Sequence, residues 1–230
     1  MDAAREPMDD RRAQLAGWFR TPLGAALLTG ALAGGTHVLG GLLIYRAVFE
    51  AQVRGTSPNL MSFIYSVVYT QYFIGCIFYL SGPTLVLRKR RLLYYASLWS
   101  ILLTGIITCY HWMPYVGLIF APIFPKLTHF LPLLAHAAVG MLIGLLLAQF
   151  YGCRAQRRAC MILGATAGII GVASFWLLFL LPNSDLSAPS REYLASFVVA
   201  NLLNGLLLTV LPTIPIERAY AARRAAEVAP

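Results

Sequence analysis

Six apolar runs, each about 20 residues or longer, alternate with short polar segments along the chain. An apolar helix of about 20 residues is long enough to cross the hydrocarbon core of a bilayer. The pattern predicts an all-α, polytopic integral membrane protein, built as a bundle of six transmembrane helices. The runs cover Pro22 to Tyr45, Leu60 to Leu87, Leu92 to Trp112, Leu127 to Phe150, Cys160 to Leu181 and Tyr193 to Thr213.

The segments outside these runs set the expected domain organisation. Residues 1–21 are charged and polar and predict an N-terminal tail, and residues 216–230 predict a C-terminal tail. Residues 22–215 form one six-helix transmembrane domain, because no stretch inside them is long and polar enough to fold as a soluble domain. The first run is too long for the apolar part of a cleavable signal peptide, so we expect it to be retained.

Composition supports placing most of the chain in a lipid bilayer. Hydrophobic residues make up 59% of the chain and charged residues only 12%, with a mean hydropathy of +0.69. Soluble domains have about 25% charged residues. The four cysteines form no CxxC pair, which excludes the usual zinc-knuckle and thioredoxin-type motifs.

The distribution of basic residues predicts the orientation. Of the 18 basic residues, 14 lie in the N-terminal tail, at 88–91, at 154–158 and at 218–224. Cytoplasmic loops carry the excess of Lys and Arg, so we expect both termini to be cytoplasmic. The net charge of +9 is then a topology signal, and we expect no nucleic-acid partner.

The segment from Tyr110 to Lys126 combines aromatic residues with prolines at 114, 122 and 125. It is apolar for a free loop and rich in prolines for a helix. We expect either an interfacial outer lid or a tight connector that rests on the bundle.

Several polar residues fall at one depth of the predicted bundle, slightly to the outer side of its midplane. Counting about 1.5 Å per helical residue from the centre of each run gives this placement. An ionisable group at such depth is a functional-site hypothesis, whereas interhelical hydrogen bonding is the structural alternative. The candidate binding residues are His37, Gln71, Tyr72, His136 and Asn201.

Small residues four positions apart recur in the first, fourth and fifth runs. Such spacing allows helix backbones to approach closely, either within the bundle or against a partner subunit. In the first run the candidate partner-docking residues are Ala26 and Gly30.

The size, the six runs, the cytoplasmic termini, the small residues Ala26 and Gly30 and the outer polar layer together resemble a substrate-binding S component of an energy-coupling-factor vitamin transporter. The resemblance covers the whole chain in outline. It implies a small-molecule ligand near the outer face, a membrane partner subunit docked on the first helix, and a place in the bacterial inner (plasma) membrane. The usual family motif has two alanines four residues apart, whereas this chain has Ala26 and Gly30.

Three alternatives stay open. His37 and His136 could ligate haem b as a b-type cytochrome, with His111 and His129 at a second haem nearer the outer surface. An intramembrane enzyme is not expected, because the sequence has no GxSG elbow, no HExxH helix and no carboxylates in the runs. A membrane assembly or anchoring subunit without a ligand would use the polar layer only to hold helices together.

Overall fold

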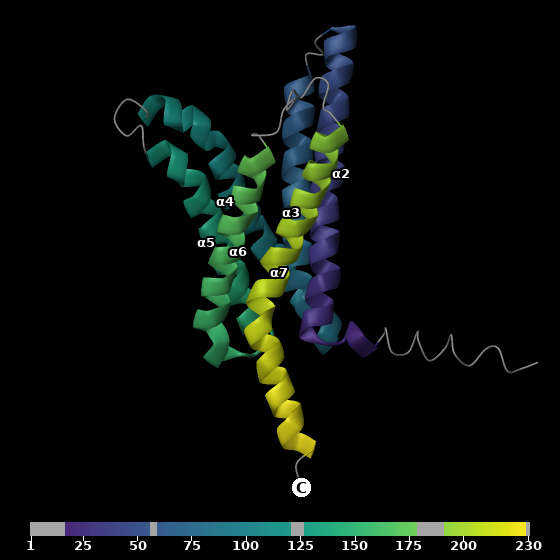
Figure 1. Cartoon of the computed structure of the whole chain (residues 1–230), viewed down its shortest axis with the longest axis vertical. Helices are drawn as coiled ribbons and strands as arrows, with labels where there is room; N and C mark the ends of the chain where they lie inside the picture. The colour runs from purple at the N-terminus through teal and green to yellow at the C-terminus, as the bar shows by residue number, and fades with distance from the viewer. Residues whose placement is uncertain (1–16, 56–58, 121–126, 179–190, 229–230) are drawn as a thin grey trace, which may run out of the picture.

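The computed structural model describes residues 17–55, 59–120, 127–178 and 191–228, and every regular element in these ranges is helical. The all-α expectation is therefore confirmed. The elements carry the labels of Figure 1: α2 (Pro22–Arg54), α3 (Leu60–Leu87), α4 (Arg90–Phe120), α5 (Leu127–Phe150), the short 3-10 turn η1 (Arg154–Gln156), α6 (Arg157–Leu178) and α7 (Arg191–Val228).

Four segments of the described chain are long and apolar enough to cross a membrane: Pro22–Ala51, Ser62–Leu87, Leu133–Phe150 and Glu192–Glu227. Apolar runs of this length are helical because lipid offers no partner for backbone polar groups, which a helix satisfies internally. These helices indicate a membrane protein.

Two helices have the boundaries that the sequence predicted. α3 and α5 begin and end where the apolar runs do. α2 continues beyond Tyr45, past an ion pair between Arg46 and Glu50 (3.0 Å), to Arg54, and Gly55 is its C-cap. Gly55 has a φ of 92°, a conformation that glycine adopts without steric cost. Polar side chains therefore carry this helix past the apolar stretch.

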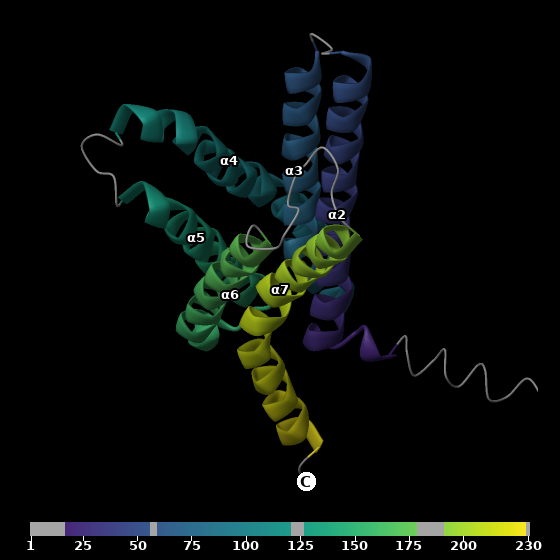
Figure 2. The same ribbon diagram turned by 45° about the horizontal axis from the view of Figure 1, so that its top comes forward.

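Prolines did not end helices where the sequence predicted. α4 continues through Pro114 to Phe120, and α7 continues through Pro212 and Pro215 to Val228. Proline removes one backbone donor and bends a helix; here Pro212 and Pro215 are buried among neighbouring helices, and α7 changes direction along its length (Figure 2). The expected outer lid or connector is thus partly helix, since residues 110–120 belong to α4, and residues 121–126 lie outside the described ranges. Residues 216–228, expected as a tail, continue α7.

The helices form a ring in which each packs on its neighbours in chain order, and contacts between α2 and α7 close the ring. Packing is most extensive between α5 and α6, and between α2 and each of α3 and α7, while α5 also reaches α3 and α7 across the ring. Consecutive helices run in opposite directions (Figure 1). The N-terminal end of α2 and the C-terminal part of α7 therefore lie at the same end of the bundle.

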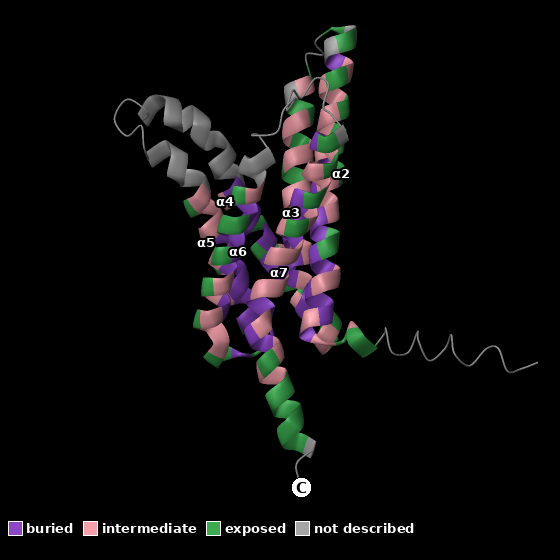
Figure 3. Cartoon of the chain, viewed as in Figure 1, coloured by how far each residue is buried: buried purple, intermediate pink, exposed green. Residues whose placement is uncertain are grey.

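Buried residues concentrate in the part of the bundle where all six helices meet, as the purple ribbon in Figure 3 shows. This core contains Leu80, Leu103 and Ile143, all fully buried. Large apolar side chains also lie exposed on outward faces, including Ile101 on α4 and Ile162 on α6. A surface of this kind suits lipid, because acyl chains are as apolar as these side chains.

Candidate functional site

His37 lies on the face of α2 that packs against α3, and only 7% of the residue is exposed. Its Nε2 is 3.1 Å from the hydroxyl of Tyr79, so one of the two groups donates a hydrogen bond to the other. The ring of Tyr72 lies 5.1 Å from the imidazole between centroids. Gly75 makes room for this arrangement, because a Cβ there would lie 2.9 Å from Nε2.

His136 is half-buried on α5 and lies within electrostatic range of His37. Its backbone carbonyl rests against Gly168 of α6, in space that any larger residue at 168 would fill. The structure thus brings His37 and Tyr72 of the predicted set together with Tyr79, and His136 lies within electrostatic range of His37. We call these four residues the histidine–tyrosine cluster.

Gln71 lies beside this cluster along the seam between α2 and α3. Its Oε1 occupies the space next to Gly40, one turn from His37 on α2. This oxygen is buried and accepts no hydrogen bond within the described chain.

Asn201 lies on α7 and is 5% exposed. Its Nδ2 donates to the carbonyl of Phe197 on its own helix at 2.9 Å. Its backbone carbonyl packs against Gly34 of α2. The side-chain amide of Asn201 is therefore bonded within its own helix, and it takes no part in the hydrogen bond between His37 and Tyr79.

Tyr79 is the site residue that the sequence analysis missed. It follows Tyr72 by seven residues on α3, a spacing that puts both on one helix face. This spacing could have identified it. Cys76 lies between them and next to Thr104 of α4, which connects the cluster to a third helix.

The predicted docking residues Ala26 and Gly30 are buried in the interface between α2 and α7. The hydroxyl of Thr209 on α7 donates to the carbonyl of Ala26 at 2.8 Å. A side chain at Gly30 would meet Thr209 and the backbone of Gly205. Packing within the chain, the alternative considered for these residues, is what the structure shows.

A second glycine seam joins α5 to α6. Gly140 lies against the carbonyl of Gly164, and Gly144 lies against that of Cys160. Small residues bring these two backbones into direct contact, as small-xxx-small spacings do in membranes. This seam fixes the position of α5, and with it the position of His136.

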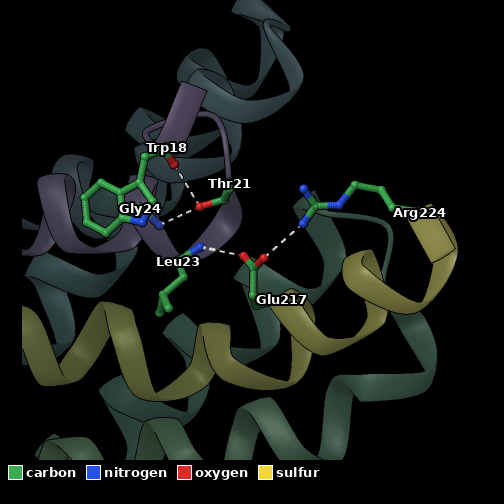
Figure 4. A network of polar contacts seen from close by, with 6 residues as sticks. All are labelled: Trp18, Thr21, Leu23, Gly24, Glu217 and Arg224. Carbon is green, nitrogen blue, oxygen red and sulfur yellow. Dashed lines mark hydrogen bonds and ion pairs between the residues drawn. The ribbon is translucent and has the colours of Figure 1, made fainter. Parts of the chain in front are cut away.

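The N-terminal end of α2 is held by a carboxylate from α7 (Figure 4). Glu217 accepts a hydrogen bond from the backbone N–H of Leu23 at 2.9 Å and another from Arg224 at 3.1 Å. The hydroxyl of Thr21 accepts from the N–H of Gly24 at 3.0 Å. A negative charge at a helix N-terminus is favourable, because the first N–H groups lack partners within the helix.

The described residues do not fit haem in this arrangement. Nε2 of His37 is bonded to Tyr79 and faces the backbone of α3 at Gly75, so this atom has no open side for a porphyrin iron. The side chains of His111 and His129, proposed for a second haem, lie outside the described part of the chain. No group of three or more His, Cys, Asp or Glu residues that could hold a metal ion occurs among the described residues.

The chemistry of the cluster is that of hydrogen bonding and aromatic packing. Imidazole and phenol groups both donate and accept hydrogen bonds, and their rings offer flat apolar faces. No family model, no curated protein and no solved structure matches the chain.

Proposed function

We propose that the chain is a six-span membrane protein that binds a small polar molecule at the histidine–tyrosine cluster, as the substrate-binding component of a transport system. The observation that carries this proposal is a histidine buried within an apolar helix, His37 on α2, which is hydrogen-bonded to Tyr79 and lies beside the ring of Tyr72, with His136 of α5 within electrostatic range. Burying ionisable groups in lipid is costly, and a pair of them marks a functional site by default.

The six-span topology, with both termini cytoplasmic, is supported by the position of the basic residues. The N-terminal end of α2, the turn between α3 and α4, the connection between α5 and α6, and the last part of α7 share one end of the bundle (Figure 1). Most of the described basic residues lie there, and Tyr94 and Tyr95 lie exposed close to Arg91. Tyrosine beside Arg and Lys is typical of the headgroup level, and the basic end faces the cytoplasm.

The composition of the cluster favours a particular ligand class. Two imidazoles, two phenols and the unpartnered amide oxygen of Gln71 offer hydrogen bonds and ring faces. The described helices place no carboxylate beside these groups, so an organic cation would lack a counter-charge. A small uncharged ring compound with its own donors and acceptors matches this chemistry.

A second candidate rests on a specific observation. His37 already has a partner in Tyr79, and Asn201 bonds its own helix. Polar side chains satisfied in this way hold helices together. In an assembly or anchoring subunit with no ligand, these interhelical contacts would be the whole role of the polar residues.

Native mass spectrometry of protein purified in mild detergent separates the two candidates. The binding proposal predicts one non-lipid compound retained at close to one copy per chain, released by denaturation and identified by its mass. Protein that carries only lipid and detergent, after extraction from the membrane in which it was made, would support the anchoring role instead.

A further inference from the structure

We propose that the connection between α5 and α6 binds the headgroup of an anionic phospholipid, whose acyl chain lies along the outer face of α6. The binding groups are Arg154 on η1 with Arg157 and Arg158 at the start of α6. This inference rests on the helices spanning a bilayer, and it does not depend on a small-molecule ligand at the histidine–tyrosine cluster.

The three guanidinium groups are uncompensated within the described chain. Neither of the ion pairs among the described residues involves them. The Nε atom of Arg157 is buried and has no hydrogen-bond acceptor there. A guanidinium that no anion within the described chain neutralises favours a charge-assisted hydrogen bond from its accessible N–H groups to an external anion.

α7 adds a fourth cation, Arg223, whereas the nearby carboxylate of α7, Glu217, bonds other groups. Arg223 lies within electrostatic range of Cys153, the residue just before η1, and 5.9 Å from the ring centroid of Tyr220. The nearby Glu217 is already engaged by Leu23 and Arg224. The field at this corner of the bundle is therefore positive.

The outer surface of α6 that follows the arginines along the chain is largely apolar, and no other described helix covers it. Arg158, Ile162 and Thr166 follow one another at four-residue spacing on a single face, and all are exposed. Ile162 is 65% exposed, and Ile169 and Ile170 continue the face at 43% and 42%. A cationic group at one end of an exposed apolar stripe matches a phospholipid, which has a phosphate at the end of a hydrocarbon chain.

The charge complementarity selects the anionic class of lipid. A basic residue near a membrane surface contributes about 1 kcal/mol toward anionic lipid, and such residues between helix ends on the cytoplasmic side bind anionic headgroups. A zwitterionic headgroup carries its own cation next to the phosphate and gains much less.

The test compares lipid retention in the full-length protein, reconstituted in nanodiscs of phosphatidylglycerol and phosphatidylcholine and then moved to mild detergent for native mass spectrometry. The probe variant is Arg154→Gln with Arg158→Gln, two exposed positions whose change leaves the core intact. The matched control is Lys89→Gln with Arg90→Gln, which removes the same charge at the same end from the turn between α3 and α4. Arg157→Gln alone serves as a second probe.

We expect wild type and the control to retain phosphatidylglycerol, and the double probe to lose roughly fivefold for each residue removed. Equal losses in probe and control would overturn the site in favour of general charge attraction. Equal retention of the two lipids by wild type would also overturn it. Inorganic phosphate at millimolar concentration, added without lipid, should leave the thermal stability of the detergent-solubilised protein unchanged; stabilisation equal to that given by phosphatidylglycerol would point to a free-phosphate site and overturn the lipid proposal.

Discussion

At the scale of single residues, the hydrogen bond between His37 and Tyr79 should contribute measurably to stability. Tyr79→Phe would remove the hydroxyl and leave the buried Nε2 of His37 without its partner. Leaving a buried polar group unsatisfied costs about 1–3 kcal/mol, so we expect a clear fall in the thermal unfolding midpoint in detergent. Tyr94→Phe is the control, because Tyr94 is 65% exposed. Equal midpoints for the two variants would mean that the 3.1 Å contact adds nothing.

A second residue-scale prediction concerns the carboxylate that holds the start of α2. Glu217→Ala would free the N–H of Leu23 and the side chain of Arg224. Loss of a helix-capping acceptor costs about 0.5–2 kcal/mol, so unfolding should occur at a lower temperature than in wild type. Glu227→Ala, at an exposed position on the same helix, should unfold like wild type. A Glu217→Ala protein as stable as Glu227→Ala would show that water replaces the contact without loss.

At the scale of helices, two adjacent glycines of α2 provide a matched comparison. A Cβ at Gly34 would meet the backbone of Asn201 and Leu202 on α7, whereas a Cβ at Gly35 meets nothing within 4 Å. Forcing atoms into a packed interface costs about 1–3 kcal/mol, while Gly→Ala at an open helical site favours the helix by up to about 1 kcal/mol. We expect Gly34→Ala to destabilise the protein and Gly35→Ala to leave it equal or more stable. The reverse order in thermal unfolding would contradict the packing of α2 on α7.

Sequence patterns predicted the helices well and their ends less well. Apolar length alone set α3 and α5, because lipid leaves a chain no alternative to helix. The pattern was wrong at Pro114, Pro212 and Pro215, where the helices continue. A proline ends a helix only when the freed groups find better partners outside it, and this depends on neighbouring helices that a single run does not reveal.

In the candidate site too, the apolar runs predict some features, and others depend on how the helices pack. Position along each run gives depth, and depth alone groups His37, Gln71, His136 and Asn201. Depth does not specify rotation about the helix axis. Asn201 consequently bonds its own helix, and Tyr79 takes the place beside His37. Gly75 leaves space for the imidazole of His37, and this role can be recognised only when the packing of α2 on α3 is known.

At the scale of the whole molecule, labelling of introduced cysteines with a membrane-impermeant maleimide tests the topology. Cysteines at Lys89 and Arg154 should react only from the cytoplasmic side, and those at Arg46 and Glu192 only from the opposite side. Burial raises the pKa of the native Cys153 thiol above its usual value, so the thiol stays protonated near neutral pH and reacts slowly. Cys76 and Cys160 are buried, and the labelling uses a Cys109→Ser variant as the background. Lys89 and Arg154 labelled from opposite sides would exclude the proposed arrangement.

The central claim is that His37 and His136 belong to one ligand site, and retention of the bound compound in His136→Leu tests it most directly. Leu suits both lipid and the bundle interior, so this variant should fold, and Gly35→Ala serves as a folded reference with an unaltered cluster. Native mass spectrometry then measures compound per folded chain in wild type and both variants. We predict full retention in wild type and Gly35→Ala, and at least about a tenfold loss in His136→Leu. Leaving a polar group of the ligand without its partner costs about 1–3 kcal/mol, and each 1.4 kcal/mol is about a tenfold change in affinity. Equal retention in all three proteins would contradict the account and leave the cluster as interhelical hydrogen bonding alone.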